Sequence, residues 1–244
     1  MEFCGVTDKG IVRKQNQDVF LAEYRNVLNA ALLVVCDGMG GAKGGSIASS
    51  MALELFSEKL GTELDAFADT DKVASVMKRA IIEANAALYE KNLIDPACAG
   101  MGTTMVAALA ADYGTVVVNV GDSRAYHITR TKITQITKDH SVVENLIDRG
   151  DITRTEAKHH PNKNLITRAL GTAPSIVSDA FFPKLKRGDY LLLCSDGLTN
   201  LLSDQEIFVE VKNSANINEC CEKLIKLAIV RGAPDNVTAV LLRK

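Results

Sequence analysis

The chain has 244 residues, of which 47% are hydrophobic, so it can bury the core of one large domain or two small ones. Its formal net charge of −2 provides no basic field to attract nucleic acid or an anionic membrane. The charged N-terminus lacks the apolar stretch of a secretory signal, and apolar runs such as AALLVV are far shorter than a membrane span. We therefore expect a cytoplasmic protein that neither binds nucleic acid nor inserts into a membrane.

In chain order, runs rich in Val, Ile, Leu and Thr alternate with amphipathic helical patterns, and no linker, low-complexity tract or fixed repeat separates them. We expect a strand at 27–36, helices at 46–60 and 71–91, strands at 103–110, 115–120, 125–129, 132–137 and 190–194, a helix at 217–231 and a strand at 237–242. The turn Asp112-Tyr113-Gly114 is too short for a crossover helix and favours antiparallel hairpins. This order predicts one α+β domain over 1–244 and argues against a doubly wound dinucleotide-binding fold.

The six cysteines show no C-x-x-C spacing, and several lie within apolar runs, where cysteine behaves as a small hydrophobe. We expect all of them to be free thiols, as is usual in the cytosol. The adjacent Cys220 and Cys221 leave a redox pair as an alternative, although two buried positions on a helix suit a cytosolic chain better.

The segment AALLVVCDGMGGAKGG (30–45) leads Asp37 from an apolar strand into a glycine-rich loop that precedes a helix. A carboxylate held at a strand end is rigid enough for a metal ligand, and glycines allow a main-chain carbonyl to face the ion. The simpler alternative is a glycine-rich turn in which Asp37 only caps the backbone. A phosphate-binding P-loop is excluded, because its lysine must be followed by Ser or Thr, whereas Gly44 follows Lys43.

Further aspartates occupy similar junctions between strands and loops: Asp196 in CSDG, Asp122 in GDSR and Asp235 in PDN. Each alone is more often a turn residue or a helix cap. Gathered with Asp37 at one end of packed sheets, these carboxylates would repel one another unless cations neutralised them. A set of carboxylates without histidine or thiolate partners selects Mg²⁺ or Mn²⁺ over zinc or copper.

Near the N-terminus, the segment RKQNQD (13–18) places Arg13 ahead of Asp18. The guanidinium fork of arginine matches phosphate oxygens in a bidentate way. An arginine taken alone is usually a surface charge. The aspartate motifs elsewhere in the chain make Arg13 a candidate for phosphate binding.

Together these segments resemble the metal-dependent type 2C serine/threonine protein phosphatases, also called the PPM family, and in particular their short bacterial members. The resemblance spans nearly the whole chain, in the family's order, through RKQNQD (13–18), CDGMGG (36–41), MGTT (101–104), GDSRAY (121–126), DHS (139–141), HPNKNLITRALG (160–171), CSDGL (194–198) and APDNVTAVLL (233–242). It implies a four-layer α-β-β-α sandwich, in which two mostly antiparallel sheets pack face to face and helices flank them. It also implies a flap subdomain at about 140–170, where the polar composition suits a mobile surface segment.

The resemblance further implies a binuclear site for Mn²⁺ or Mg²⁺. Asp37 is expected to bridge the ions, with the Gly38 carbonyl on one of them and with Asp196 and Asp235 on the other. Asn236 is expected to orient the loop that bears Asp235.

The remaining family roles concern the outer ligands and the substrate. Asp18 is expected to act on the ion bound by Gly38 through water, and Asp122 with Asp196 to form the site of a third ion found in bacterial members. Arg13 is expected to hold the substrate phosphate. The implied reaction is a single in-line attack of metal-activated water on phosphoserine or phosphothreonine of proteins, by a monomer that counteracts a serine/threonine kinase.

The sequence departs from the family pattern at Met39, where many eukaryotic members have a histidine that is a candidate general acid, and at Gln17, where many relatives have glutamate. The acid that protonates the leaving group is therefore open between a bound water, His140 and His160. The missing charge at Gln17 predicts weaker binding of one ion.

A catalytically dead phosphoprotein-binding module is one alternative function, but it should have lost metal ligands, and Asp37, Asp196 and Asp235 are all present. A phosphatase for a small molecule or for one dedicated anti-sigma antagonist is another. Such relatives often carry appended sensor or coiled-coil domains, which this chain lacks.

Overall fold

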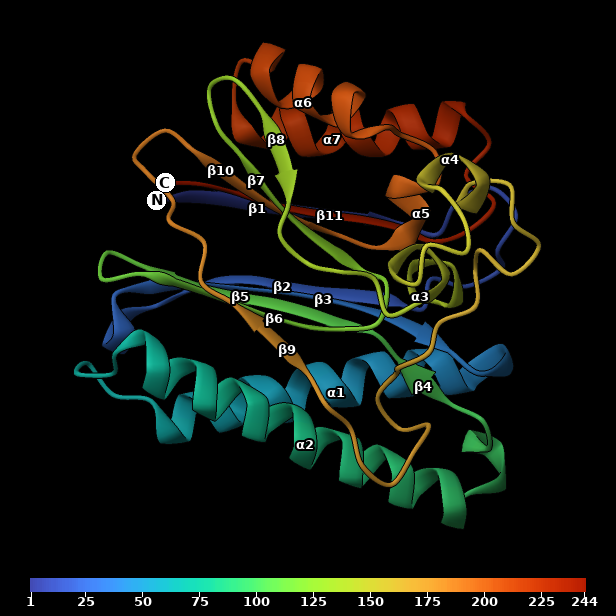
Figure 1. Ribbon diagram of the computed structural model, residues 1–244. Helices are drawn as coiled ribbons and strands as arrows, with labels where there is room; N and C mark the ends of the chain where they lie inside the picture. The colour runs from blue at the N-terminus through green and yellow to red at the C-terminus, as the bar shows by residue number, and fades with distance from the viewer.

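Two antiparallel sheets pack face to face in the computed structural model, which describes residues 1–244 except for the side chain of Ala42 (Figure 1). One sheet has the order β1-β11-β10-β7-β8 and the other the order β2-β3-β5-β6-β9, with β4 paired to β3. The strands are β1 Glu2–Asp8, β2 Asp18–Arg25, β3 Ala30–Met39, β4 Gly102–Thr103, β5 Met105–Ala111, β6 Thr115–Val120, β7 Arg124–Ile128, β8 Ile133–Gln135, β9 Asp179–Phe181, β10 Tyr190–Cys194 and β11 Val237–Arg243.

Helices cover the outer face of each sheet. The pair α1 and α2 lies against the β2-β3-β5-β6-β9 sheet, and α6 and α7 lie against the other sheet (Figure 1). The helices are α1 Gly41–Glu63, α2 Thr70–Ile94, α3 Val142–Asp148, α4 Arg154–Ala157, α5 Asp196–Thr199, α6 Asp204–Asn213 and α7 Ile217–Val230, with short 3₁₀ turns at Asn26–Leu28 and Pro96–Cys98. The predicted four-layer α-β-β-α sandwich is confirmed.

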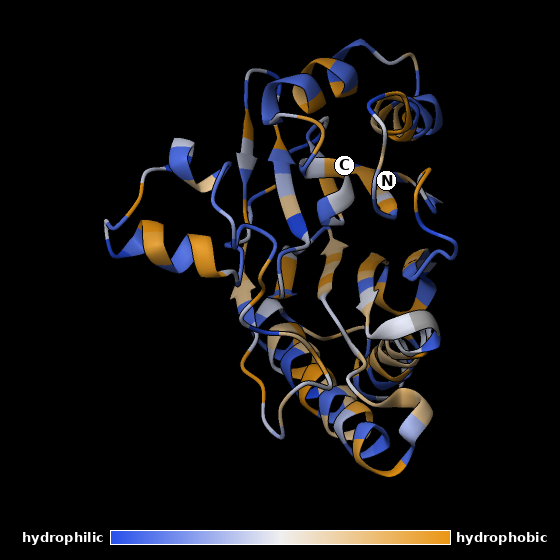
Figure 2. Ribbon diagram, turned by 90° about the vertical axis from the view of Figure 1, so that its right-hand side faces the viewer, coloured by the Kyte–Doolittle hydropathy of each residue, from blue (hydrophilic) through white to orange (hydrophobic). Residues whose placement is uncertain are grey.

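Strand alternation distributes the apolar residues over the layers. In β3, Leu33 and Val35 face the opposite sheet, where they share a cluster with Leu193 and Val240, while Leu32 and Val34 face α1 and α2. Since both faces of the inner strands are covered, they are apolar almost throughout rather than alternating with polar residues. Figure 2 shows hydrophobic and hydrophilic segments alternating along the helices that flank the sheets.

Most predicted elements are present, with shifted ends. The strand expected at 27–36 is β3 at Ala30–Met39, so Asp37 lies within the strand instead of after it. The helix expected at 46–60 begins at Gly41, because the glycines at 44 and 45 adopt helical backbone. The hairpin at Asp112-Tyr113-Gly114 is confirmed by the 2.9 Å hydrogen bond from Ala111 N to Gly114 O and by the antiparallel pairing of β5 with β6. The strands β1, β2 and β9 and the helices α3, α4, α5 and α6 were not predicted.

The prediction that all cysteines are free thiols is wrong for one pair, because Cys4 and Cys221 form a disulfide that links β1 to α7. These residues are 217 positions apart, so only the packing of α7 on the edge strand β1 brings them together. Cys36, Cys98, Cys194 and Cys220 are free and buried, as expected.

The termini and the segment expected to be the flap lie at different ends of the sandwich. Glu2 pairs with Arg243 at one end, whereas α3 and α4 lie at the other, beside α5 (Figure 1). The segment returns toward the sheet through an isolated bridge between Ser141 and Ile166. No helix in the described part of the chain is long and apolar enough to cross a membrane.

Candidate active site

A cavity of about 750 Å³ opens at the end of the sandwich that bears α5. Loops that precede or follow strands of both sheets form its wall, so residues far apart in the sequence meet there. The lining includes all the predicted site residues except the buried Asp18: Arg13, Asp37, Gly38, Asp122, Asp196 and Asp235, together with Lys14, Gln15, Gln17, Met39, Gly40, Gly41, Thr104, Asn164, Ile166, Asn200 and Pro234.

Asp37 is fixed through its main chain. Its N–H donates to Thr104 Oγ1 at 3.0 Å, and its carbonyl accepts from Thr103 Oγ1 and Thr104 N, both at 2.9 Å. The next residue must be glycine, because a Cβ on Gly38 would lie 2.1 Å from the Gly45 carbonyl oxygen at the start of α1. The close contact of β3 with α1 therefore leaves the Asp37 side chain directed at the cavity on a rigid backbone.

Asp18 lies opposite Asp37 in the register of β2 and β3. It is only 4% exposed, and its Oδ2 accepts hydrogen bonds from Ser195 Oγ at 2.7 Å and Thr238 Oγ1 at 2.6 Å. Its other oxygen, Oδ1, is buried without a partner among the described residues. Burial of an unpaired carboxylate oxygen is costly, so this atom is suited to a further ligand.

The other aspartates reach the cavity from separate loops. Asp196 begins α5 after β10 and accepts a hydrogen bond from Asn200 Nδ2 at 3.0 Å, while Asp235 precedes β11, the neighbour of β10. Asp122 follows β6, and the adjacent Ser123 hydroxyl shares a 2.7 Å hydrogen bond with Thr104. The predicted convergence of these carboxylates is therefore present in the structure.

Arg13 lies on a loop that Asn236 holds in place. The Asn236 amide donates to the carbonyls of Lys9 at 2.9 Å and Gln15 at 3.0 Å, and its oxygen accepts from Gln17 N at 2.8 Å. Arg13 Nη2 lies 2.7 Å from Asp235 Oδ2 while 54% of its side chain remains exposed. The guanidinium thus has a fixed direction at the cavity and free donors.

The carboxylates raise one another's proton affinity. Burial, followed by the charge of Asp18, raises the pKa of Asp37 well above its ordinary value, and burial and Asp235 raise the pKa of Asp196. Burial raises the pKa of Asp18 to about 6, and burial with the charge of Asp196 raises the pKa of Asp122 to about 7. Bound cations would relieve this repulsion, and ligands that are all oxygen suit Mg²⁺ or Mn²⁺.

No group of three or more His, Cys, Asp or Glu side chains in the described chain is close enough to enclose one ion by itself. Hard divalent ions commonly take part of their coordination from main-chain carbonyls and water. Gly38 lines the cavity, and Asp18 Oδ1 is buried without a partner among the described residues, so the residues present fit divalent ions.

Comparison with known proteins agrees with this geometry. The model of the protein phosphatase 2C family matches residues 11–224. The chain belongs to this family. The serine/threonine phosphatase stp of Listeria monocytogenes is 36% identical over 240 residues, which cover 98% of this chain and 94% of that protein.

Solved structures extend the likeness to the fold of the phosphatase. Serine/threonine phosphatase Stp1 from Staphylococcus aureus has a TM-score of 0.93 at 37% identity, covering 100% of this chain and 94% of that one. The catalytic domain of the phosphatase PstP, solved in complex with 2 manganese ions, has a TM-score of 0.81 at 34% identity, covering 98% and 96%. The chain is accordingly a metal-dependent serine/threonine protein phosphatase that acts on phosphoproteins.

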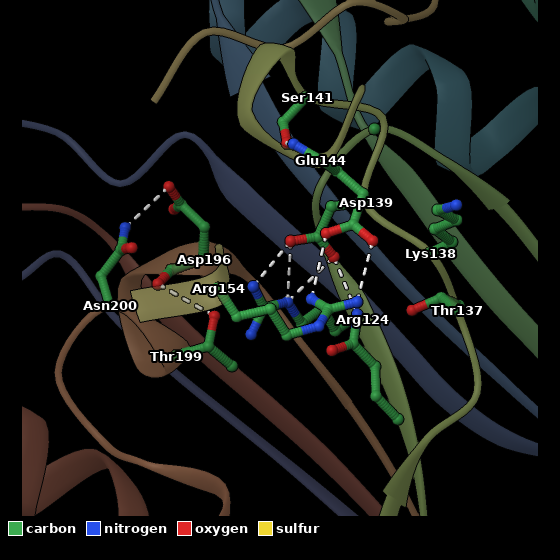
Figure 3. Close-up of polar contacts among 12 residues, drawn as sticks. Arg124, Thr137, Lys138, Asp139, Ser141, Glu144, Arg154, Asp196, Thr199 and Asn200 are labelled. Atoms are coloured by element: carbon green, nitrogen blue, oxygen red, sulfur yellow. Dashed lines mark hydrogen bonds and ion pairs between the residues drawn. The ribbon is translucent and has the colours of Figure 1, made fainter. Parts of the chain in front are cut away.

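A second cavity of about 700 Å³ adjoins the first, with Asp122, Asn164, Asp196 and Asn200 in both walls. It lies between α5 and α6 on one side and α3 and α4 on the other. Figure 3 shows its ion pairs: Arg124 binds Asp139, with Nη2 at 2.6 Å from Oδ2, and Arg154 binds Glu144 at 3.0 Å. The first pair joins β7 to the segment that precedes α3, and the second joins α3 to α4.

The histidines considered as general acids are not placed for that role in the phosphatase. His140 is 6% exposed, both its ring nitrogens have protein partners, and burial lowers its pKa. His160 accepts from Asn162 N at 3.1 Å, and neither histidine lines either cavity. Met39 does line the first cavity, as expected from its position after Asp37 and Gly38.

Sequence reasoning missed several residues of the site. Ser195 and Thr238 bind the buried Asp18, Asn200 binds Asp196, and Asn164 and Ile166 line the cavity from the returning segment. Ser195 could have been noticed because it directly precedes Asp196. The contact of Thr238 depends on the pairing of distant strands, for which the sequence contains no local signal.

Proposed function

We propose that the catalytic cavity holds two divalent ions, Mn²⁺ or Mg²⁺, and hydrolyses phosphoserine and phosphothreonine in proteins in one in-line step. The observation that carries this proposal is that Asp37, Asp196 and Asp235 line one cavity, while Asp18, opposite Asp37, has a buried oxygen without a partner among the described residues. When bound there, such ions lower the pKa of water and offset the charge on the phosphoryl oxygens.

In this proposal Asp37 would be shared by the two ions, because the charges of Asp18, Asp196, Asp122 and Asp235 all act on its carboxylate and raise its pKa. The Gly38 carbonyl would serve one ion, and Asp196 with Asp235 the other. The main-chain hydrogen bonds of Asp37 keep the bridging carboxylate in position without using its oxygens.

The outer positions complete the proposed site. Asp18 would act on the Gly38-bound ion through water, as its buried position behind Asp37 suggests. Asp122 and Asp196 would hold a third ion, since burial and the charge of Asp196 raise the pKa of Asp122.

Arg13 would bind the phosphate of the substrate. Its contact with Asp235 orients the guanidinium, and its exposed donors can form charge-assisted hydrogen bonds with phosphoryl oxygens. Cys36 and Cys194 are poor candidates for a nucleophile, because burial raises the pKa of the Cys36 thiol far above neutrality and that of Cys194 to about 12. Water is therefore the proposed nucleophile.

We further propose that 1–244 forms one catalytic domain, with 140–170 as a flap beside the active site. The side-by-side cavities and the ion pairs at the base of α3 and α4 support this division. A monomer in the cytoplasm that counteracts a serine/threonine kinase is the expected cellular setting. Comparing the phosphoproteomes of cells with and without the protein would identify the kinase and other substrates.

The direct test is hydrolysis of a phosphothreonine peptide and of para-nitrophenyl phosphate with Mn²⁺. Asp196→Asn should lower kcat/KM at least about 100-fold, because it removes a proposed ligand. Asp112→Asn, at the exposed turn between β5 and β6, is the matched control and should leave kcat/KM unchanged. Chelator should abolish hydrolysis by the wild type, and full activity in excess chelator would contradict the proposal.

A further inference from the structure

His140 is a buried polar residue that the proposed chemistry does not use, and it lies where the chain leaves β8 for α3. We propose that His140 is a positioning residue, whose imidazole holds Gly121 beside Asp122 on one edge and Asp179, the ion-pair partner of Arg168, on the other. It thereby fixes the position of the Asp122 loop relative to the flap segment that contains Thr167 and Arg168. The inference rests on the proposed role of Asp122 as a ligand.

The contact with Gly121 fixes the tautomer of the ring. The main-chain N–H of Gly121 donates to His140 Nδ1 at 3.0 Å. The main-chain N–H of His140 donates in turn to the Gly121 carbonyl at 3.0 Å. A backbone N–H can only donate, so Nδ1 must be an unprotonated acceptor. The neutral ring then carries its hydrogen on Nε2.

The other edge of the ring meets the flap and β9. Nε2 lies 3.1 Å from Asp179 Oδ2 and 3.1 Å from Arg168 Nη1. Since Nε2 carries the hydrogen, it donates to the Asp179 carboxylate and cannot accept from Arg168. The Arg168 guanidinium instead pairs with the same carboxylate, with Nη1 3.4 Å from Oδ1. The main chain adds a 2.7 Å hydrogen bond from Thr167 N to the His140 carbonyl.

These contacts connect two parts of the catalytic wall. Thr167 and Arg168 follow Ile166, which lines the cavity, and Gly121 precedes Asp122, which lines both cavities. Gly121 has φ +104°, and a Cβ there would lie 2.6 Å from Thr104 Cγ2, so its peptide has little room to move on that side. His140 Nδ1 restrains the Gly121 N–H as well, so loss of this acceptor would loosen the Asp122 loop.

Two near-isosteric variants separate the two edges of the ring. In His140→Asn the side-chain oxygen can replace Nδ1 as acceptor for Gly121 N–H, whereas in His140→Gln the amide nitrogen can replace Nε2 as donor to Asp179. His140→Ala removes both contacts. His160→Asn, in the flap but outside both cavities, is the matched control.

The primary readout is hydrogen exchange in chelator, which reports the contacts whether or not metal or substrate binds. In His140→Ala and His140→Gln, exchange at the Gly121 amide should quicken by about tenfold or more, the loss expected for one buried hydrogen bond. His140→Asn should keep that protection but show faster exchange and proteolysis in 150–165. Calorimetry should then show weaker Mn²⁺ binding in His140→Gln than in His140→Asn.

Unchanged exchange at Gly121 in His140→Ala would overturn the proposal, as would His140→Asn and His140→Gln behaving alike in every readout. If the variants do not fold, the wild type still decides, because imidazole ¹⁵N shifts must show the hydrogen on Nε2. A hydrogen on Nδ1 would contradict the inference. If hydrogen exchange changes as predicted but the protein shows no phosphatase activity, the positioning role of His140 stands and only the proposed function is rejected.

Discussion

The buried Asp18 makes the site a source of instability when no ion is present, and Asp18→Asn measures that cost. The pKa of Asp18 rises from 3.8 to about 6 in the folded protein, chiefly through burial. The folded state therefore holds a proton that the unfolded chain releases, so stability falls as pH rises through this window. The full cost is about 3 kcal/mol, and about half of it develops between pH 5 and 7.5.

The assay is urea unfolding of wild type and Asp18→Asn in chelator at both pH values. The variant has no charge to bury, so its advantage over the wild type should grow by about 1.4 kcal/mol from pH 5 to pH 7.5. Mn²⁺ at 100 times its Kd should restore about 2.7 kcal/mol to the wild type at pH 7.5 and less to the variant. A difference between the two proteins that does not change with pH would refute this reasoning.

Other substitutions test separate parts of the site and fold. Arg13→Ala should raise KM roughly 10- to 100-fold, because it removes charge-assisted hydrogen bonds to the substrate phosphate. The exposed ion pair that it breaks contributes less than about 1 kcal/mol to stability. An unchanged KM would remove Arg13 from phosphate binding. Gly38→Ala should destabilise the fold and weaken Mn²⁺ binding, because the new Cβ would lie 2.1 Å from the Gly45 carbonyl oxygen. The control Gly61→Ala in α1 should do neither. Equal unfolding midpoints for both variants would contradict the close contact. Thiol titration of the denatured, unreduced protein should detect only the free cysteines. Loss of the disulfide in Cys221→Ser should lower the free energy of unfolding by about 2–4 kcal/mol. Titration of all six thiols would rule out the disulfide.

The sequence predicted best where local pattern and packing agree. Tyr190–Cys194 and Thr115–Val120 are apolar strands with both faces covered, and the periodic residues of α2 and α7 gave helices within a few positions of those observed. The edge strands β1 and β2 carry mixed, partly exposed residues. Their structure comes from pairing with β11 and β3, which no local pattern reports.

The candidate site followed a similar division. The junction positions of Asp37, Asp122, Asp196 and Asp235 suggested ligands, and resemblance to the family ordered them. The buried hydrogen bonds from Ser195 and Thr238 to Asp18, and the hydrogen bond from Gly121 to His140, depend on contacts between segments that are distant in the sequence. The Cys4–Cys221 disulfide depends on tertiary packing in the same way.

The central claim is that Asp37 holds the ions that the phosphatase needs. Calorimetric titration of the chelator-stripped protein with Mn²⁺, for wild type, Asp37→Asn and the Asp112→Asn control, tests it most directly. We predict that wild type and control bind ions with the same affinities, and that Asp37→Asn loses at least about 100-fold in affinity, since its carboxylate would bridge two ions. Binding by Asp37→Asn with the affinity and stoichiometry of the wild type would contradict the account.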